Sequence, residues 1–169
     1  MLNLNLLIGN VCSLLAMVTD SVSATQKTVK RVLLVQCISQ LIYCAGTIVL
    51  KGYSGATQNV VSIFRNFFAM GNKSNKYIEW SLVALGVILG VCFNNIGFMG
   101  LLPVIANLQY AIVMFQLRGN EKILKISFLL SAIMFAAFNG ALFNVVGVVT
   151  NSVVAITTGI SLYKDARSG

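Results

Sequence analysis

The sequence predicts an all-α membrane protein with seven transmembrane helices, and three observations lead to this fold class. First, 57% of its 169 residues are hydrophobic and 9% are charged, whereas soluble domains carry about 25% charged residues. Second, polar breaks divide the chain into seven apolar stretches, each close to the ~20 residues that cross a bilayer. Third, ten of the twelve Lys and Arg residues fall on alternate loops between these stretches.

The predicted spans cover residues 4–22, 29–50, 54–71, 77–94, 97–117, 123–139 and 142–162. The connections after the first, third, fifth and seventh spans are basic, and in or directly beside them lie Lys27, Lys30, Arg31, Lys73, Lys76, Arg118, Lys122, Lys125, Lys164 and Arg167. The other connections carry only Lys51. Short basic loops stay in the cytoplasm. We therefore expect an inner-membrane, multi-pass protein whose N-terminus is outside and whose C-terminus is cytoplasmic.

The first two spans are ordinary apolar helices. No basic segment precedes the first span, so it does not resemble a cleavable signal peptide. It carries Asn10 and, at its predicted cytoplasmic end, Asp20. All four cysteines lie inside apolar stretches without C-x-x-C spacing, which favours packing as small hydrophobic side chains.

The third and seventh spans each carry a polar stripe. In the third span the stripe follows helical spacing through Gly55, Asn59, Ser62 and Asn66. In the seventh it comprises Asn144, Gly147, Asn151, Thr158 and Ser161. Polar groups are costly in hydrocarbon, so both stripes should face the interior of the bundle. Such residues either hold helices together or bind a solute. We favour packing for the glycines, Ser62 and Thr158, and a solute site for Asn59 and Asn151.

Arg65 lies about ten residues into the third span. An arginine at the centre of a membrane helix costs about 2.5–3.5 kcal/mol even on the more lenient insertion scale. Two interpretations stay open: the side chain extends to the cytoplasmic edge, or it lines a cavity and attracts an anionic or carbonyl-bearing solute. Asp20 is a candidate partner, because the first and third spans approach the cytoplasmic face together.

The fourth and fifth spans carry aromatic anchors and a proline. Tyr77 and Trp80 lie near a loop, as expected of side chains at the membrane interface. Pro103 is the only proline in the chain and lies early in the fifth span. A first-turn proline leaves a helix straight, whereas a proline further inside bends it and could serve as a hinge for alternating access.

The span plan suggests an internal repeat of three helices, one helix and three helices. Residues 1–71 form the first three-helix bundle, residues 72–96 the linking helix and residues 97–169 the second bundle. One linking span keeps both triplets in the same orientation, as in parallel repeats. A shift of 92 residues matches Ser39 with Ser131, Gly55 with Gly147 and Asn59 with Asn151. In the first spans, Ile8-Gly9-Asn10 matches Ile105-Ala106-Asn107.

Three segments carry a family resemblance. Gly52-Tyr53-Ser54-Gly55-Ala56 followed by Ser62-Ile63-Phe64-Arg65, the run Leu101-Leu102-Pro103-Val104-Ile105, and the part that begins at Leu117-Arg118-Gly119 resemble the YgjV-type family of bacterial inner-membrane proteins. The span plan also resembles the SWEET, SemiSWEET and PQ-loop superfamily of transporters. That resemblance implies solute-binding asparagines on the third helix of each triplet, which Asn59 and Asn151 match. It also implies proline hinges in the first helix of each triplet, and only Pro103 of the second triplet matches one. The resemblance is not extended to sugar specificity.

Composition narrows the function. The chain has no histidine and four acidic residues, so we expect no metal site, no cofactor and no enzyme activity. The net charge of +8 is spread over short loops, which favours contact with anionic lipid over nucleic acid. We predict a transporter, a facilitator that moves a small polar solute by alternating access. Its site would comprise Asn59, Asn151, Asn10, Asn107, Arg65 and Ser62, with Pro103 as hinge. The alternative is a non-transporting membrane partner or assembly subunit. A homo-oligomer is left open.

Overall fold

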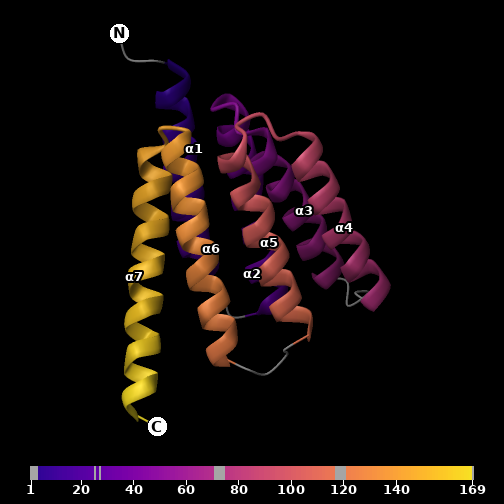
Figure 1. The fold of residues 1–169 in the computed structure, drawn as a ribbon, viewed down its shortest axis with the longest axis vertical. Coiled ribbons are helices and arrows are strands. Elements are labelled where there is room, and N and C mark those ends of the chain that lie inside the picture. The colour runs from indigo at the N-terminus through magenta and orange to yellow at the C-terminus, as the bar shows by residue number, and fades with distance from the viewer. Residues whose placement is uncertain (1–3, 25, 27, 71–74, 117–120, 169) are drawn as a thin grey trace.

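The computed structural model describes residues 4–24, 26, 28–70, 75–116 and 121–168 (Figure 1). Within these residues the secondary structure consists of helices without a strand, which confirms the all-α prediction. The helices are α1 (Leu4–Ala24), α2 (Val29–Val49), α3 (Tyr53–Met70), α4 (Lys76–Cys92), α5 (Phe98–Gln116), α6 (Glu121–Ala141) and α7 (Val145–Ser168). Each covers one predicted span. Lys27, Lys73 and Arg118, on which part of the topology prediction depends, lie outside the described residues.

Side-chain caps fix where three helices begin. Thr28 accepts a hydrogen bond from the backbone N–H of Arg31 at the start of α2. Asn75 does the same for Ile78 at the start of α4, at 2.9 Å. At the start of α7, the Oδ1 atom of Asn144 accepts from Gly147 N–H at 3.1 Å. Each cap satisfies a backbone donor that has no partner within its helix.

The ends of α2 and α6 have the same geometry. Lys51 and Phe143 both adopt a left-handed conformation, with φ of 60° and 55°. The next residue donates back to the carbonyl five positions earlier, Gly52 to Thr47 at 2.8 Å and Asn144 to Asn139 at 2.9 Å. This pattern is a Schellman motif. Corresponding residues of the two turns are 92 positions apart in the sequence.

The helices form two rows with α4 packed on one side. The first row is α1, α2 and α3, and the second row is α5, α6 and α7. Adjacent helices in each row pack together, and the rows meet where α1 contacts α7 and where α3 contacts α5. Helix α4 packs on α3 and α5. Among the described residues α1 does not contact α3, and α5 does not contact α7. In a three-helix bundle the first and third helices would also touch. Here each group of three helices forms a row, in which short turns place successive helices side by side.

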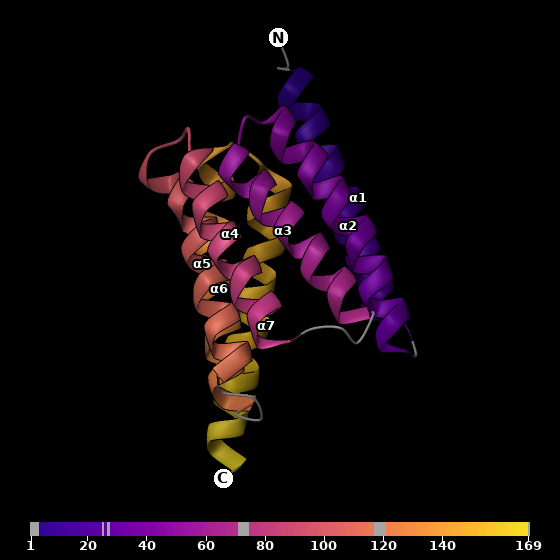
Figure 2. The ribbon, with the colours of Figure 1, turned by 90° about the vertical axis from the view of Figure 1, so that its right-hand side faces the viewer.

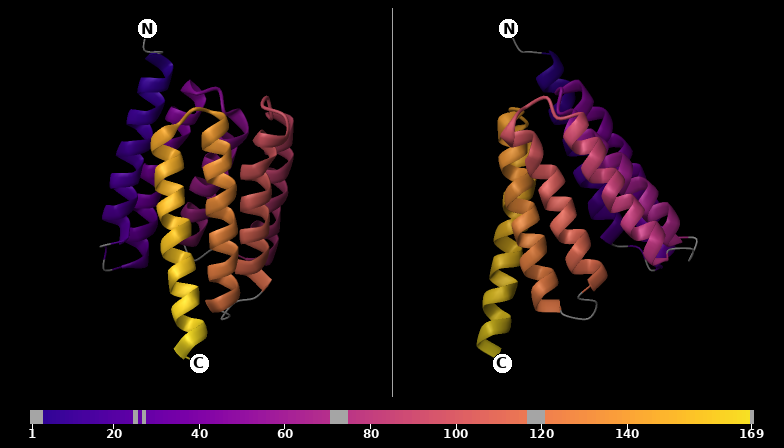
Figure 3. Two further views of the ribbon diagram at one scale, coloured as in Figure 1. Left: turned by 60° about the vertical axis from the view of Figure 1, so that its left-hand side comes forward. Right: turned by 45° about the vertical axis from the view of Figure 1, so that its right-hand side comes forward.

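The two rows converge at one end and diverge at the other. Figure 2 and the right-hand view of Figure 3 show them close together near the N-terminus and apart near the C-terminus. We call the wide end the basic end, because the helix termini there carry Lys30, Arg31, Lys76, Lys122, Lys164 and Arg167. The narrow end, where α2, α4 and α6 end, is called the opposite end.

The interior contains small and polar side chains, and the surface contains large apolar ones. Buried residues include Ala16, Ala106, Ala132, Ser39, Ser54, Ser131, Gln58, Asn66 and Asn144. Large apolar side chains are exposed on every described helix, for example Leu15 at 53%, Phe67 at 66% and Ile156 at 62%. This distribution is the reverse of that in a soluble domain. It suits helices that pack through small residues and face lipid.

Two described helices are long and apolar enough to cross a membrane on their own. These stretches are Leu4–Val22 in α1 and Val145–Asp165 in α7. Shorter apolar stretches cover Leu33–Val49, Phe98–Val113 and Lys125–Ala141. The arrangement of seven spans as 3+1+3 stays a prediction.

Candidate functional site

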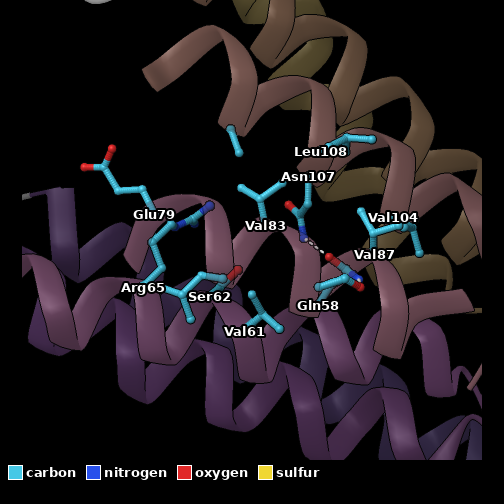
Figure 4. Close-up of a pocket in the computed structure, with 13 residues that line it drawn as sticks. Gln58, Val61, Ser62, Arg65, Glu79, Val83, Val87, Val104, Asn107 and Leu108 are labelled. Carbon is cyan, nitrogen blue, oxygen red and sulfur yellow. Dashed lines mark hydrogen bonds between the residues drawn. The ribbon is translucent and has the colours of Figure 1, made fainter. Parts of the chain in front are cut away.

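A small cavity lies between α3, α4 and α5 (Figure 4). Its volume is about 30 Å³, which is room for about two water molecules. Its walls are mostly apolar and include Val61, Val83, Val87, Val104 and Leu108. The polar groups are Gln58, Ser62 and Arg65 of α3, Glu79 of α4 and Asn107 of α5. The structure thus brings together three of the predicted site residues, Ser62, Arg65 and Asn107.

Gln58 organises one end of this cavity. Its Nε2 atom donates to the Gly86 carbonyl at 2.8 Å, and its Oε1 atom accepts from Asn107 Nδ2 at 3.0 Å. The side chain is 2% exposed. Helix α4 can approach so closely because Gly86 and Gly90 face α3 and α5 without side chains. Gln58 is not among the predicted site residues, because only its neighbour Asn59 lies on the predicted stripe.

Arg65 lines the other end of the cavity without an ion pair to any described residue. Figure 4 shows its guanidinium directed into the cavity and the Glu79 carboxylate directed away from it. Asp20 lies beside Ser39 and Tyr43 at the α1–α2 interface. The predicted pairing of Asp20 with Arg65 is therefore wrong, since the two side chains face different helices. Of the two interpretations of Arg65, the one that places it in a cavity is the one that fits the structure.

The polar stripe of α3 is distributed over several neighbours. A side chain at Gly55 would meet Phe138 of α6 and Thr47 of α2. Asn66 donates to Gln36 of α2 at 3.5 Å. Asn59 is half-buried and lies one turn after Gly55 on the same face. This face of α3 is therefore directed towards α2 and the second row.

Asn151 is half-buried on the corresponding part of α7, and its Nδ2 atom donates to the Gly147 carbonyl of its own helix at 2.8 Å. A side chain at Gly147 would meet Asn139 and Asn144. Gly147 thus marks a close approach of α6 and α7. The structure does not bring Asn59 and Asn151 into contact with each other through any hydrogen bond among the described residues.

Asn10 lies where α1 meets the start of α7, away from the cavity. Its Oδ1 atom accepts from Val146 N–H at 3.0 Å. One turn further along α1, Ser13 accepts from Asn144 Nδ2 at 2.7 Å. The same Asn144 nitrogen donates to Asn139 Oδ1, also at 2.7 Å. These side chains join the two rows at the opposite end, and we call Asn10, Ser13, Asn139 and Asn144 the polar seal.

If the two rows are repeats, their serine contacts do not pair Asn10 with Asn107, as the sequence match between the first spans does. Ser39 donates to the Ala16 carbonyl and Ser131 to the Ala106 carbonyl, both at 3.2 Å. Ala16 and Ala106 therefore occupy the same place relative to the serine of the next helix. The residues that follow them, Met17 and Asn107, then correspond as well. Short matches between apolar helices do not fix the register, because many shifts give similar agreement.

Pro103 is fully buried in the second turn of α5. The first-turn interpretation is therefore wrong, since α5 begins at Phe98. A proline at this position leaves the carbonyl of Met99 without its helical donor. The hinge stays a prediction.

A wider hollow lies towards the basic end. It has a volume of about 420 Å³ and is open on one side. Its lining comes from all three helices of the second row and comprises Tyr110, Lys125, Phe128, Thr157, Thr158 and Ser161. Lys125 forms an ion pair with Asp165 at 2.7 Å. Tyr110 precedes Ala111, which lines the small cavity from the same helix α5.

Comparison with known proteins identifies the family. Residues 7–168 match the family model Imp-YgjV, which is described as a bacterial inner membrane protein. No curated protein and no solved structure matches the chain. The family match covers nearly the whole sequence and agrees with the apolar helix surfaces described above. The chain therefore belongs to the Imp-YgjV family of bacterial inner membrane proteins.

Proposed function

We propose that this inner membrane protein is a transporter, a facilitator that moves a small polar solute by alternating access between its two rows of helices. The observation that carries the proposal is where the rows meet. Hydrogen bonds join residues 10–17 of α1 to residues 144–150 at the start of α7 and Gln58 of α3 to Asn107 of α5, and Gly52 and Gly55 approach Phe138 of α6. Towards the basic end the rows diverge (Figure 2). A transporter open to one side has this form, and by the positive-inside rule that side would be cytoplasmic.

Several features support two parallel repeats as the basis of this motion. The Schellman turns after α2 and α6 match, and so do the bonds of Ser39 and Ser131 to the neighbouring helix. The contact of α1 with α7 corresponds to that of α5 with α3 when the rows are exchanged. A two-fold axis along the membrane normal relates repeats of this kind. Helix α4 would return the chain to the side where the second repeat begins.

Asn59 and Asn151 are the proposed solute contacts. Both are half-buried, and each lies one turn after a glycine that faces neighbouring helices. An amide offers a donor and an acceptor, which suits a neutral or carbonyl-bearing solute. Ser62, Arg65 and Asn107 would extend the site along α3 and α5. Asn10 would belong to the polar seal and not to the binding site.

A non-transporting membrane partner is the second candidate, and one observation favours it. The enclosed cavity has a volume of only about 30 Å³, whereas ligand pockets usually measure about 300–1,000 Å³. The amides of Asn10, Asn144 and Asn151 are also bonded within the protein. In this case the polar groups would serve helix packing alone.

Flux and stability measured on the same variants separate the two candidates. The protein is reconstituted in liposomes, and swelling is recorded with glycerol, erythritol, urea, glycine and acetate. For Asn59→Ala and Asn151→Ala we expect loss of flux of at least one solute, equivalent to about 1–3 kcal/mol of binding, with an unchanged melting temperature. Ser21→Ala is the control, since this exposed hydroxyl bonds only to the Met17 carbonyl of its own helix. Lower melting temperatures with unchanged flux would contradict a solute site on Asn59 and Asn151. Absence of flux of every solute in the parent would support the partner and contradict transport.

A further inference from the structure

Arg65 is held in the cavity without a negative partner. It is half-buried on α3, and no ion pair joins it to a described carboxylate. Glu79 lines the same cavity, but its carboxylate is directed away from the guanidinium (Figure 4). Keeping a cation at membrane depth is costly. A ligand that supplies the missing negative charge would offset this cost.

We infer that the cavity between α3, α4 and α5 binds the carboxylate group of a small organic anion, with Arg65 as its charged partner. Ser62 lies one turn before Arg65 and lines the same cavity, so its hydroxyl could bind the second end of a carboxylate. At the far end, the Gln58–Asn107 pair closes the cavity with two amides. The inference names the solute class of the proposed transporter and therefore rests on that proposal.

The geometry selects a carboxylate more readily than a larger group. A volume of about 30 Å³ admits a group of two or three heavy atoms, in view of the ~10–15 Å³ that one water requires. The planar guanidinium can donate two parallel hydrogen bonds to two carboxylate oxygens. The cavity is partly open, so the rest of the solute would extend out of it. The apolar valines of the cavity wall strengthen the charge interaction by excluding water.

Acetate and acetamide test the inference, because they have the same shape and differ in charge. The full-length protein in detergent is titrated with each at constant ionic strength, and ligand-dependent thermal stabilisation is measured. We expect acetate to stabilise the parent and acetamide to have at most a tenth of that effect. In Arg65→Gln the apparent Kd for acetate should rise about tenfold or more, and Arg65→Lys should lie in between because it keeps the charge without the fork.

Lys51→Gln is the matched control, because Lys51 is an exposed cation in the turn before α3. It should bind acetate like the parent. The inference would be overturned if acetamide or chloride alone stabilised the parent as much as acetate does. It would also be overturned if acetate stabilised Arg65→Gln as much as the parent. The ligand-free melting temperature of each variant reports whether it is folded, and Arg65→Lys provides the same comparison if Arg65→Gln does not fold.

The liposome assay distinguishes failure of this inference from failure of transport. Flux of glycerol or urea without acetate binding would overturn the carboxylate site and leave transport standing. Acetate binding without flux of any solute would keep the site and contradict the transporter. Acetate binding with acetate flux, both weakened in Arg65→Gln, supports both.

Discussion

Asn144 connects the two rows through one buried side chain. Its Nδ2 atom donates to Ser13 of α1 and Asn139 of α6, and its Oδ1 atom caps the first turn of α7. The residue is 4% exposed, so a lost bond is not replaced by water. Removing such an amide leaves buried polar groups unsatisfied.

We therefore expect Asn144→Ala to lower the free energy of unfolding by about 1–3 kcal/mol. Asn151→Ala is the control, because Asn151 is half-buried and bonds only to its own helix among the described residues. Its melting temperature should match that of the parent. Thermal unfolding in the same detergent measures both. Similar melting temperatures for Asn144→Ala and the parent would mean that the polar seal does not hold the rows together.

At the scale of single residues, the sequence predicts which polar residues are buried better than it predicts which residues they contact. Helical spacing identified Ser62 and the cost of burial identified Arg65, and both line the cavity. Periodicity gave no sign that Gln58 faces α4, because the sequence does not say which neighbour lies beside each face. The signal that could have found it is the pair Gly86 and Gly90, which marks a close approach of α4. Asp20 was paired wrongly for the same reason.

At the scale of elements, two glycines of α4 have different surroundings. A Cβ atom on Gly90 would overlap the Val104 methyl of α5 and lie 2.6 Å from Gln58 Nε2. Valine is stiff at χ1, and the Gln58 amide is already bonded to the Gly86 carbonyl. A Cβ atom on Gly86 would meet Val61 at 3.4 Å, close to an ordinary contact.

Gly90→Ala should accordingly destabilise the protein by about 1–3 kcal/mol through overpacking. Gly86→Ala should be neutral or stabilise by up to about 1 kcal/mol, because alanine favours a helix. The opposite signs of the two changes in melting temperature form the test. Equal tolerance of both alanines would show that α4 does not pack against α5 as described.

The helices themselves follow directly from the apolar stretches, and α3 and α4 begin within one residue of their predicted starts. The arrangement into rows does not follow from the sequence. A stripe such as Gly55 to Asn66 indicates a buried face, but a bundle and a row both bury it. The register between the two rows does not follow from the sequence either, because matching the bonds of Ser39 and Ser131 pairs Met17 and not Asn10 with Asn107.

At the scale of the whole molecule, the basic end should face the cytoplasm. Single cysteines at Lys51 and Lys164, both exposed and at opposite ends, form a matched pair in a background without the four native cysteines. In intact spheroplasts, we expect an impermeant maleimide to label position 51 and to label position 164 only after lysis. Labelling of position 164 in intact spheroplasts, with protection of position 51, would reverse the orientation.

Alternating access requires the two rows to move relative to each other. Spin labels at Phe67 of α3 and Ile160 of α7, both exposed and towards the basic end, report the distance between the rows. Labels at Leu34 and Phe67 lie within the first row and provide the control. Pulsed electron resonance in liposomes should give two distances between the rows, for open and closed states, and one distance within the row. A single narrow distance for the pair between the rows would contradict alternating access.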